Sequence, residues 1–427
     1  MDKDIIIYHN DLTDSDNWAT ARFLQRATLE NPSIDVIWIV EPRPVSLGLY
    51  MTKKQIDACR ELLELYFPSY EDSYKLLRGG FLQQSDLDKI EGLTKQHRDL
   101  LEFAIKPANG PEEDAILHGH LVALDLLAFL RCWSSNPVDL FLDIDTLDDI
   151  EMPMNLNLHY HEELLARSQQ ELGEYNSIMQ RPYPQRIQPI RDWYDKCIQS
   201  LQHSVIDKDH TVSNLNLSSL CEKVKAAKSV KFFGGASLGL LQRLIHEDAV
   251  SNIECCLQVG AFDLSKSLFR NQFNIALNLD AAKLVLSKTQ AFASFVIVPT
   301  ETAKRVKYAL SSLTHEDPTL SKRCLGFNCR VDPMEIATGE VTVNDLADES
   351  YPMPDLTAFF CTFQRGFVGA TLARARLVDN DGQLVLRHDK SGILVYYGIP
   401  QDILVNEISG VVAALRWVGS EIGRGTR

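Results

Sequence analysis

The chain has 427 residues, of which 45% are hydrophobic and 24% are charged, so it can fold around a large core and is not expected to be disordered. Its formal net charge of −15 argues against general binding to nucleic acid or anionic lipid, because a phosphate-rich surface selects proteins with a basic face. A neutral or cationic small molecule, or a divalent metal ion, suits this charge better.

Hydropathy and cysteine spacing predict a cytoplasmic protein. No apolar run approaches the roughly 18–20 residues that span a bilayer, and the start MDKDIIIYHN has too short an apolar stretch for a signal peptide. The nine cysteines include no CxxC pair, so we interpret them as reduced thiols, mostly in the core.

Strands and helices alternate along the first 80 residues. The apolar run IIIY predicts a buried parallel strand, and the residues after it have helical spacing, with Ser15 or Asp16 placed to cap the helix. The predicted strands cover residues 4–8, 33–40 and 74–77, and the helices cover 17–30 and 52–66. This βαβαβ order indicates a parallel sheet covered on both faces.

The same alternation returns in the second half of the chain. Strands are predicted over 230–233, 253–259 and 294–298, with helices through residue 245 and over 280–287. Asn380-Asp381-Gly382 is a hairpin signal. Between the halves, residues 81–228 look largely helical and irregular. The fold class is therefore α/β, an open and mostly parallel sheet flanked by helices. We expect one domain over 1–427, with 81–228 as an insertion within it.

An acidic loop follows the first predicted strand, where open parallel sheets bind their ligands. It carries His9, Asp11, Asp14 and Asp16. Three carboxylates within six residues repel one another unless a cation or proton lies among them, and such oxygen ligands suit Ca²⁺ or Mg²⁺. The alternative interpretation is an Asp-rich surface loop that caps a helix.

The segment HNDLTDSDN resembles the amino-terminal signature of the inosine-uridine-type nucleoside hydrolases, commonly DTDPGIDDA. It keeps the second and fourth aspartates of that pattern as Asp11 and Asp16. The first aspartate, the glycine and the third aspartate are replaced by His9, Thr13 and Ser15.

Three further similarities follow in the order of that family. GGASLGLLQRLI resembles GPLTNLA and places Ser237 where a threonine lends its backbone carbonyl to the metal. IECCLQVGAF and NQFNIALNLDAAKLVL resemble IVVMGGA and AEFNIYVDPEAA, which puts Gln272 at the family's glutamate and Asn274 at its ribose-binding asparagine. MPDLTAFF resembles LHDPLAV, with Asp355 as a distant metal ligand and Pro354 in place of the histidine. Together the similarities cover about half of the chain.

The resemblance implies a nucleoside hydrolase fold and an enzyme that cleaves the N-glycosidic bond of a nucleoside or nucleoside-like small molecule. Ca²⁺ would coordinate the attacking water and two ribose hydroxyls, and Asp11 would accept a proton from that water. The implied metal ligands are Asp11, Asp16, Asp355 and the carbonyl of Ser237, and the implied substrate contacts are Ser15, Arg43, Gln272 and Asn274. Homo-oligomers are also implied.

Three departures from the family pattern leave alternatives open. Ser15 brings no negative charge toward a developing cation, and Pro354 removes a proton donor for the departing base. Arg43, in EPRP after the second strand, disfavours an oxocarbenium ion and favours a carboxylate or phosphate on the ligand. The chain is therefore a hydrolase of nucleosides, a hydrolase of a modified anionic substrate, or a binding or regulatory protein that kept the fold and lost catalysis.

Other polar clusters are interpreted as structural. The pairs His118/His120 and His159/His161 lack a third metal ligand. VDLFLDID and the acidic residues after it lack the glycine and terminal glutamate of an EF-hand, so Asp143, Asp145, Asp148 and Asp149 are expected at a solvated strand end.

Overall fold

The computed structural model describes residues 4–12, 14–30, 34–49, 51, 53–67, 82, 84–105, 110–134, 136–151, 162–265, 269–313, 317–346, 349–363, 371–397 and 403–405. The strand expected over 74–77 and the pair His159/His161 lie outside these residues.

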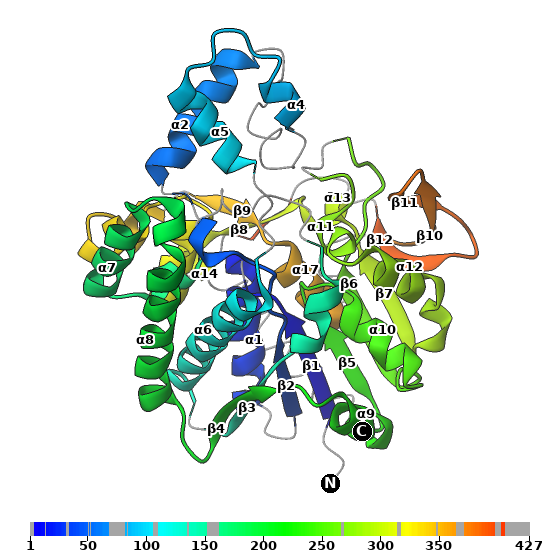
Figure 1. Ribbon diagram of the computed structural model, residues 1–427. Coiled ribbons are helices and arrows are strands. Elements are labelled where there is room, and N and C mark those ends of the chain that lie inside the picture. The colour runs from blue at the N-terminus through cyan, green and yellow to red at the C-terminus, as the bar shows by residue number, and fades with distance from the viewer. Residues whose placement is uncertain are drawn as a thin grey trace.

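A ten-stranded sheet forms the centre of the molecule, in the order β11-β10-β12-β7-β6-β5-β1-β2-β3-β4 (Figure 1). Its strands are β1 (Asp4–Asn10), β2 (Ile34–Val40), β3 (Val138–Leu142), β4 (His210–Asn214), β5 (Val230–Phe233), β6 (Ile253–Gln258), β7 (Ser294–Val298), β10 (Thr371–Asn380), β11 (Gln383–His388) and β12 (Ile393–Tyr397). Neighbours from β4 through β7 to β12 are parallel, and β10 pairs antiparallel with β11 and β12. The expected α/β class is confirmed.

The central strands are buried on both faces, as their continuous apolar runs require. In β1, Ile6 and Tyr8 point into one hydrophobic cluster, whereas Ile5 and Ile7 point into the other. This alternation is the two-residue period of a strand. Because both faces of β1 are covered, only its carboxyl end can present polar groups to a ligand.

Helices cover both faces of the sheet (Figure 1). The cluster that includes Ile6 contains residues of α1 (Ser15–Glu30), α6 (Glu112–Arg131), α7 (Gln169–Met179), α8 (Ile187–Val205), α15 (Pro318–Phe327), α16 (Pro333–Thr338) and α17 (Pro354–Phe363). The opposite cluster contains residues of α9 (Leu217–Ala226), α10 (Gly239–His246), α11 (Phe273–Ala276) and α12 (Leu279–Ser287).

Two smaller units complete the described structure. The helices α2 (Lys53–Tyr66), α4 (Gln84–Leu87) and α5 (Lys95–Ala104) share a hydrophobic cluster of their own, which lies at the top of Figure 1. A three-stranded sheet has the order β13-β8-β9, from β8 (Val306–Ala309), β9 (Ser350–Pro352) and β13 (Ile403–Val405). The short helices α13 (Thr300–Ala303) and α14 (Leu310–Leu313) flank β8 in sequence.

Residues 81–228 were expected to be an insertion, but part of this segment belongs to the central sheet and its core. Their described part is largely helical, but β3 and β4 extend the central sheet beyond β2, and α6 and α8 pack into its main core. The sequence VDLFL of β3 does not indicate which strands pair with it, so its position beside β2 was not predicted. The limits of the domain stay a prediction.

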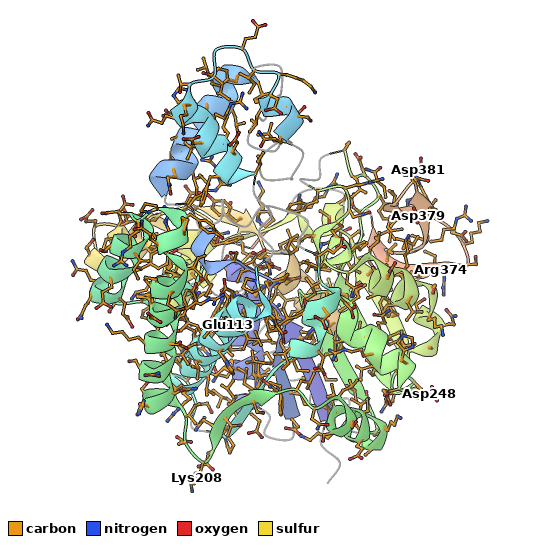
Figure 2. All side chains as sticks on the ribbon, viewed as in Figure 1. Glu113, Lys208, Asp248, Arg374, Asp379 and Asp381 are labelled. Atoms are coloured by element: carbon orange, nitrogen blue, oxygen red, sulfur yellow. The ribbon has the colours of Figure 1, made fainter. Side chains whose placement is uncertain are left out.

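Local signals in the sequence had mixed outcomes. The hairpin at Asn380-Asp381-Gly382 is confirmed, since Asp381 and Gly382 have φ of 51° and 82° as a type I′ turn needs, and Asp381 stands at the molecular edge in Figure 2. Capping by Ser15 or Asp16 is wrong, because α1 begins at Ser15 and both residues lie in its first turn. Among the described residues, no helix has the length and apolar character of a membrane span.

Candidate functional site

Three aspartates gather near the carboxyl end of β1. Asp11 follows that strand, Asp16 lies in the first turn of α1, and Asp355 lies in the first turn of α17. Asp11 and Asp16 are buried, and the amide of Asp355 donates a 2.9 Å hydrogen bond to Oδ2 of Asp16. The structure thus brings together residues that are about 340 positions apart in the sequence, as the resemblance implied.

Burial and mutual repulsion make these carboxylates reluctant to ionise together. Burial, followed by repulsion from Asp14, raises the pKa of Asp16 to about 8, although the Asp355 amide opposes this shift. Burial and the negative charge of Asp16 raise the pKa of Asp355 well above its ordinary value. Oδ1 of Asp355 is buried and has no hydrogen-bond partner among the described residues. Such a group is stabilised by a bound cation or a proton.

Arg43 brings a positive charge to this cluster. It follows β2 and is buried, and its Nε donates a 3.2 Å hydrogen bond to Oδ2 of Asp11, which Nη2 also contacts. Oδ1 of Asp11 accepts a 3.0 Å hydrogen bond from Asn17. The guanidinium also lies 4.9 Å from the ring centroid of Phe273. Asp11 must therefore change partners before it can serve fully as a metal ligand or base.

The turn after β5 fits closely against the cluster. A Cβ on Gly235 would lie 1.9 Å from Oδ2 of Asp355, and one on Gly234 would lie 1.5 Å from the carbonyl oxygen of His9. Only residues without a side chain fit here. Ser237 in the same turn donates from its amide and hydroxyl to Glu41, at 2.9 and 2.5 Å. A role for its carbonyl in metal binding stays a prediction.

The predicted substrate contacts are engaged with other protein groups. Ser15 Oγ donates a 2.6 Å hydrogen bond to Asn328 at the end of α15. Near the end of β6, Nε2 of Gln272 donates to the Gln258 side chain at 3.1 Å, and Nδ2 of Asn274 donates to the Gln258 carbonyl at 3.0 Å. The structure thus places Gln272 and Asn274 together, but their contact with a ribose stays a prediction.

A small cavity connects some of these groups. Its volume is about 10 Å³, and its lining includes His9, Ser237, Gln258 and Asn274. Ligand pockets usually measure about 300–1,000 Å³, whereas a cavity of this size holds at most one water. A sugar that reached Asn274 through this space would need the turn after β5 to move.

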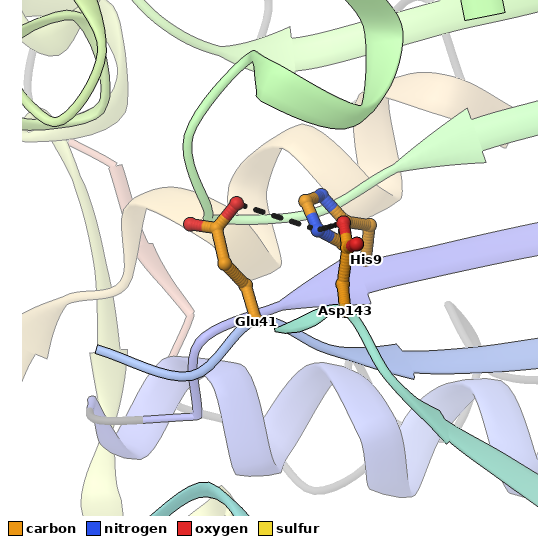
Figure 3. Close-up of side chains that lie close together, drawn as sticks. All are labelled: His9, Glu41 and Asp143. Atoms are coloured by element: carbon orange, nitrogen blue, oxygen red, sulfur yellow. Dashed lines mark ion pairs between the residues drawn. The ribbon is translucent and has the colours of Figure 1, made fainter. Parts of the chain in front are cut away.

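The sequence interpretation missed a second polar cluster. Asp143 is fully buried rather than solvated, and it lies with His9 and Glu41 at the carboxyl ends of three adjacent strands (Figure 3). The expectation of a solvated strand end was wrong for this residue because β3 pairs with β2, whose end carries Glu41. Each of the three residues occurs at or just after a predicted strand, which was the available signal.

The histidine pair on α6 is not brought together as a site. His118 is buried and lies 3.5 Å from Glu163, and His120 is partly exposed on the same helix. Successive positions of a helix point in different directions, as the sequence interpretation assumed.

Comparisons with known proteins give structural likeness without sequence support. No family model matches the sequence, and no curated protein does. A type III effector protein, XopQ complexed with adenosine diphosphate ribose, is 9% identical over 99% of this chain and 93% of that chain, with a TM-score of 0.39. The effector protein XOO4466 is 10% identical over 99% and 93%, with a TM-score of 0.43. A purine-preferring ribonucleoside hydrolase from Gardnerella vaginalis is 10% identical over 98% and 99%, with a TM-score of 0.37. At these values the likenesses decide nothing about activity.

Proposed function

We propose that this chain is a Ca²⁺-dependent hydrolase that cleaves the N-glycosidic bond of a nucleoside-like small molecule. The observation that carries the proposal is the group formed by Asp11, Asp16 and Asp355 at the carboxyl end of β1, in which one buried carboxylate oxygen has no hydrogen bond from any described residue.

The residues of this group fit a hard divalent cation. Ca²⁺ binds six to eight oxygen atoms, and carboxylates and backbone carbonyls are its usual protein ligands. Asp16 and Asp355 have raised pKa values, so a nearby cation would favour their ionised forms. The ligands would be Asp11, Asp16, Asp355 and the Ser237 carbonyl. When bound, the ion would activate the attacking water and orient the sugar hydroxyls.

Asp11 is our candidate for the general base. Asn17 donates a hydrogen bond to one of its oxygens and so fixes the position of the carboxylate. Its other oxygen contacts Arg43, so Asp11 can accept a proton only after Arg43 turns away. If Asp11 is the base, substrate binding must therefore draw Arg43 away from it.

An anionic substrate is the variant that Arg43 favours. A guanidinium can make two parallel hydrogen bonds to the carboxylate or phosphate of a ligand, as it can to a carboxylate of the protein. If the substrate carried such a group, Arg43 would pair with it instead of with Asp11. Asp11 would then be able to accept a proton. We therefore propose a nucleoside-like molecule with a phosphate or carboxylate as the preferred substrate.

A binding protein without catalysis is the second candidate. The pairing of Arg43 with Asp11 supports it, because the arginine already neutralises the central carboxylate. The hydrogen bond from Ser15 to Asn328 supports it too, since this serine faces another protein group.

The test combines metal titration with a product assay. Chelator-treated protein is titrated with Ca²⁺ by calorimetry, in parallel with Asp16→Asn and the exposed control Asp139→Asn. The same three proteins are then screened for sugar release from nucleosides and from nucleoside phosphates. Ca²⁺ binding and sugar release that vanish only in Asp16→Asn support the hydrolase. Ca²⁺ binding without sugar release supports the second candidate, and absence of Ca²⁺ binding overturns the proposed metal site.

A further inference from the structure

Three adjacent strands end in side chains that commonly bind metals. His9 lies in β1, Glu41 follows β2 and Asp143 follows β3, and each is no more than 1% exposed. Nε2 of His9 lies 3.5 Å from Oε2 of Glu41 and 3.5 Å from Oδ2 of Asp143. Figure 3 shows the imidazole directed at both carboxylates. Among the described residues, this is the group whose three ligand atoms all lie within 4.8 Å of one another.

The two distances from Nε2 of His9 fit a shared metal ion better than direct hydrogen bonds. Nε2 of His9 has no hydrogen-bond partner among the described residues, although it is fully buried. Hydrogen bonds from nitrogen to oxygen span about 2.7–3.2 Å. A tetrahedral ion with bonds of about 2.0–2.2 Å instead holds neighbouring ligand atoms roughly 3.3–3.6 Å apart.

Each carboxylate is also held by a second residue. Ser237 donates to both oxygens of Glu41, through its amide and its hydroxyl. Nη2 of Arg243 contacts both oxygens of Asp143. Supporting contacts of this kind orient the ligands of metal sites. They also mean that neither carboxylate depends on His9 alone for a partner.

We propose that His9, Glu41 and Asp143 bind a transition metal ion, with Zn²⁺ as the first candidate. An imidazole nitrogen with two carboxylates suits Zn²⁺, whereas Ca²⁺ prefers oxygen ligands only. The ion would join the ends of β1, β2 and β3 and, through Ser237, the turn after β5. It would act as a structural link between these segments, and this proposal does not depend on the proposed hydrolase activity.

The competing arrangement is an internal ion pair, in which a protonated His9 shares its charge between the two carboxylates. That arrangement needs no metal. Zn²⁺ titration against a competing chelator distinguishes the metal site from the internal ion pair. Excess Ca²⁺ in every sample keeps any cation site at Asp11 occupied, so that Zn²⁺ does not bind there.

The experiment titrates the metal-stripped full chain with Zn²⁺ against a chromophoric chelator. We expect one equivalent to bind to the wild-type protein and to raise its unfolding temperature. His9→Gln should weaken binding by at least the roughly 10–100-fold that loss of a supporting residue costs, whereas Asp16→Asn should leave it unchanged. Glu41→Gln repeats the test should His9→Gln fail to fold.

Spectroscopy of the Co²⁺-substituted protein guards against binding to the exposed thiol of Cys132. Nitrogen and oxygen ligation without thiolate charge-transfer bands supports the proposal. It is overturned if the wild-type protein binds no stoichiometric Zn²⁺, if His9→Gln binds it equally well, or if thiolate bands dominate.

Discussion

Among the residues near the carboxyl end of β1, Arg43 controls the charge available to a ligand. Its guanidinium contacts the carboxylate of Asp11 and lies over Phe273, and it is buried. Its contact with Asp11 joins a predicted substrate contact to a predicted metal ligand. The balance between Arg43 and a bound cation can therefore be measured by removing the arginine.

Arg43→Met should strengthen Ca²⁺ binding by about 10–100-fold, because a hydrogen bond to a charged group contributes roughly 1.5–3 kcal/mol and Asp11 would no longer be shared. Calorimetric titration measures the change. Arg22→Met is the matched control, since Arg22 lies on α1 and pairs with Asp317, which precedes α15. Unchanged affinity in Arg43→Met would show that Asp11 is not a metal ligand. Loss of activity on anionic substrates in the same variant would support the anion-binding role of Arg43.

The raised pKa of Asp16 predicts a stability that falls with increasing pH. Its folded-state pKa of about 8 exceeds the value of about 3.9 in an unfolded chain, so the folded protein binds the extra proton. The stabilising contribution is complete below pH 4 and is lost as the pH rises to 8, by up to about 1.4 kcal/mol per pH unit. Thermal unfolding in chelator should show wild type losing stability relative to Asp16→Asn over this range. A constant difference between the two proteins contradicts the shift.

Asp11 and Asp16 could be predicted from the sequence because they stand five positions apart, directly after a strand that its own apolar run identifies. Glu41 and Asp143 gave no such signal. Their meeting with His9 depends on which strands are neighbours, and the pairings of β1 with β2 and of β2 with β3 join segments up to about 100 residues apart. The partners of Arg43 and Ser15 also depend on side-chain directions that no spacing rule supplies.

At the scale of elements, the strands with long apolar runs were predictable and the tertiary role of residues 81–228 was not. β1, β2, β5, β6 and β7 each lie within a residue or two of their predicted ranges. β3 and β4 have five residues each; buried and less buried positions alternate in β3, whereas β4 becomes more exposed toward its carboxyl end. β4 forms one edge of the sheet and β3 lies next to it, which explains this weaker pattern, since strands nearer the centre are covered more fully on both faces.

The glycine turn between β5 and α10 gives a prediction at this scale. Gly234→Ala should lower the free energy of unfolding by about 1–3 kcal/mol or more, because the new methyl group meets the backbone of β1. In Gly235→Ala the atoms nearest the new methyl group are those of the Asp355 carboxylate, so it should abolish Ca²⁺ binding at a smaller cost in stability. Urea unfolding and calorimetry measure the two effects.

Gly173 in α7 is the matched control for these substitutions, because a Cβ there has no neighbour within 4 Å. Gly173→Ala should stabilise the protein by up to about 1 kcal/mol, the difference in helix propensity between the two residues. If Gly234→Ala and Gly235→Ala behaved like this control, the close approach of the turn to β1 and α17 would be refuted.

Across the whole molecule, a buried ionic cluster joins residues 81–228 to the C-terminal half. Asp125 on α6 contacts Nη2 of Arg167, and its Oδ2 lies 3.7 Å from Nη2 of Arg323 on α15. Arg323 also lies 3.9 Å from the ring centroid of Trp18 on α1. All three charged side chains are almost fully buried. The cluster thus connects elements from three distant parts of the sequence around one core.

Asp125→Ala should therefore destabilise the whole chain rather than one region. Removing one member of a buried ion pair costs about 3–5 kcal/mol, since the remaining charges lose a partner that water cannot replace. We expect the urea midpoint to fall in a single transition, followed both by tryptophan fluorescence and by far-ultraviolet circular dichroism. Asp139→Ala, at an exposed position of β3, should change the midpoint little. Separate transitions by the two probes would instead mean that residues 81–228 unfold independently of the sheet, and that β3 and β4 are additions to a core that is stable without them.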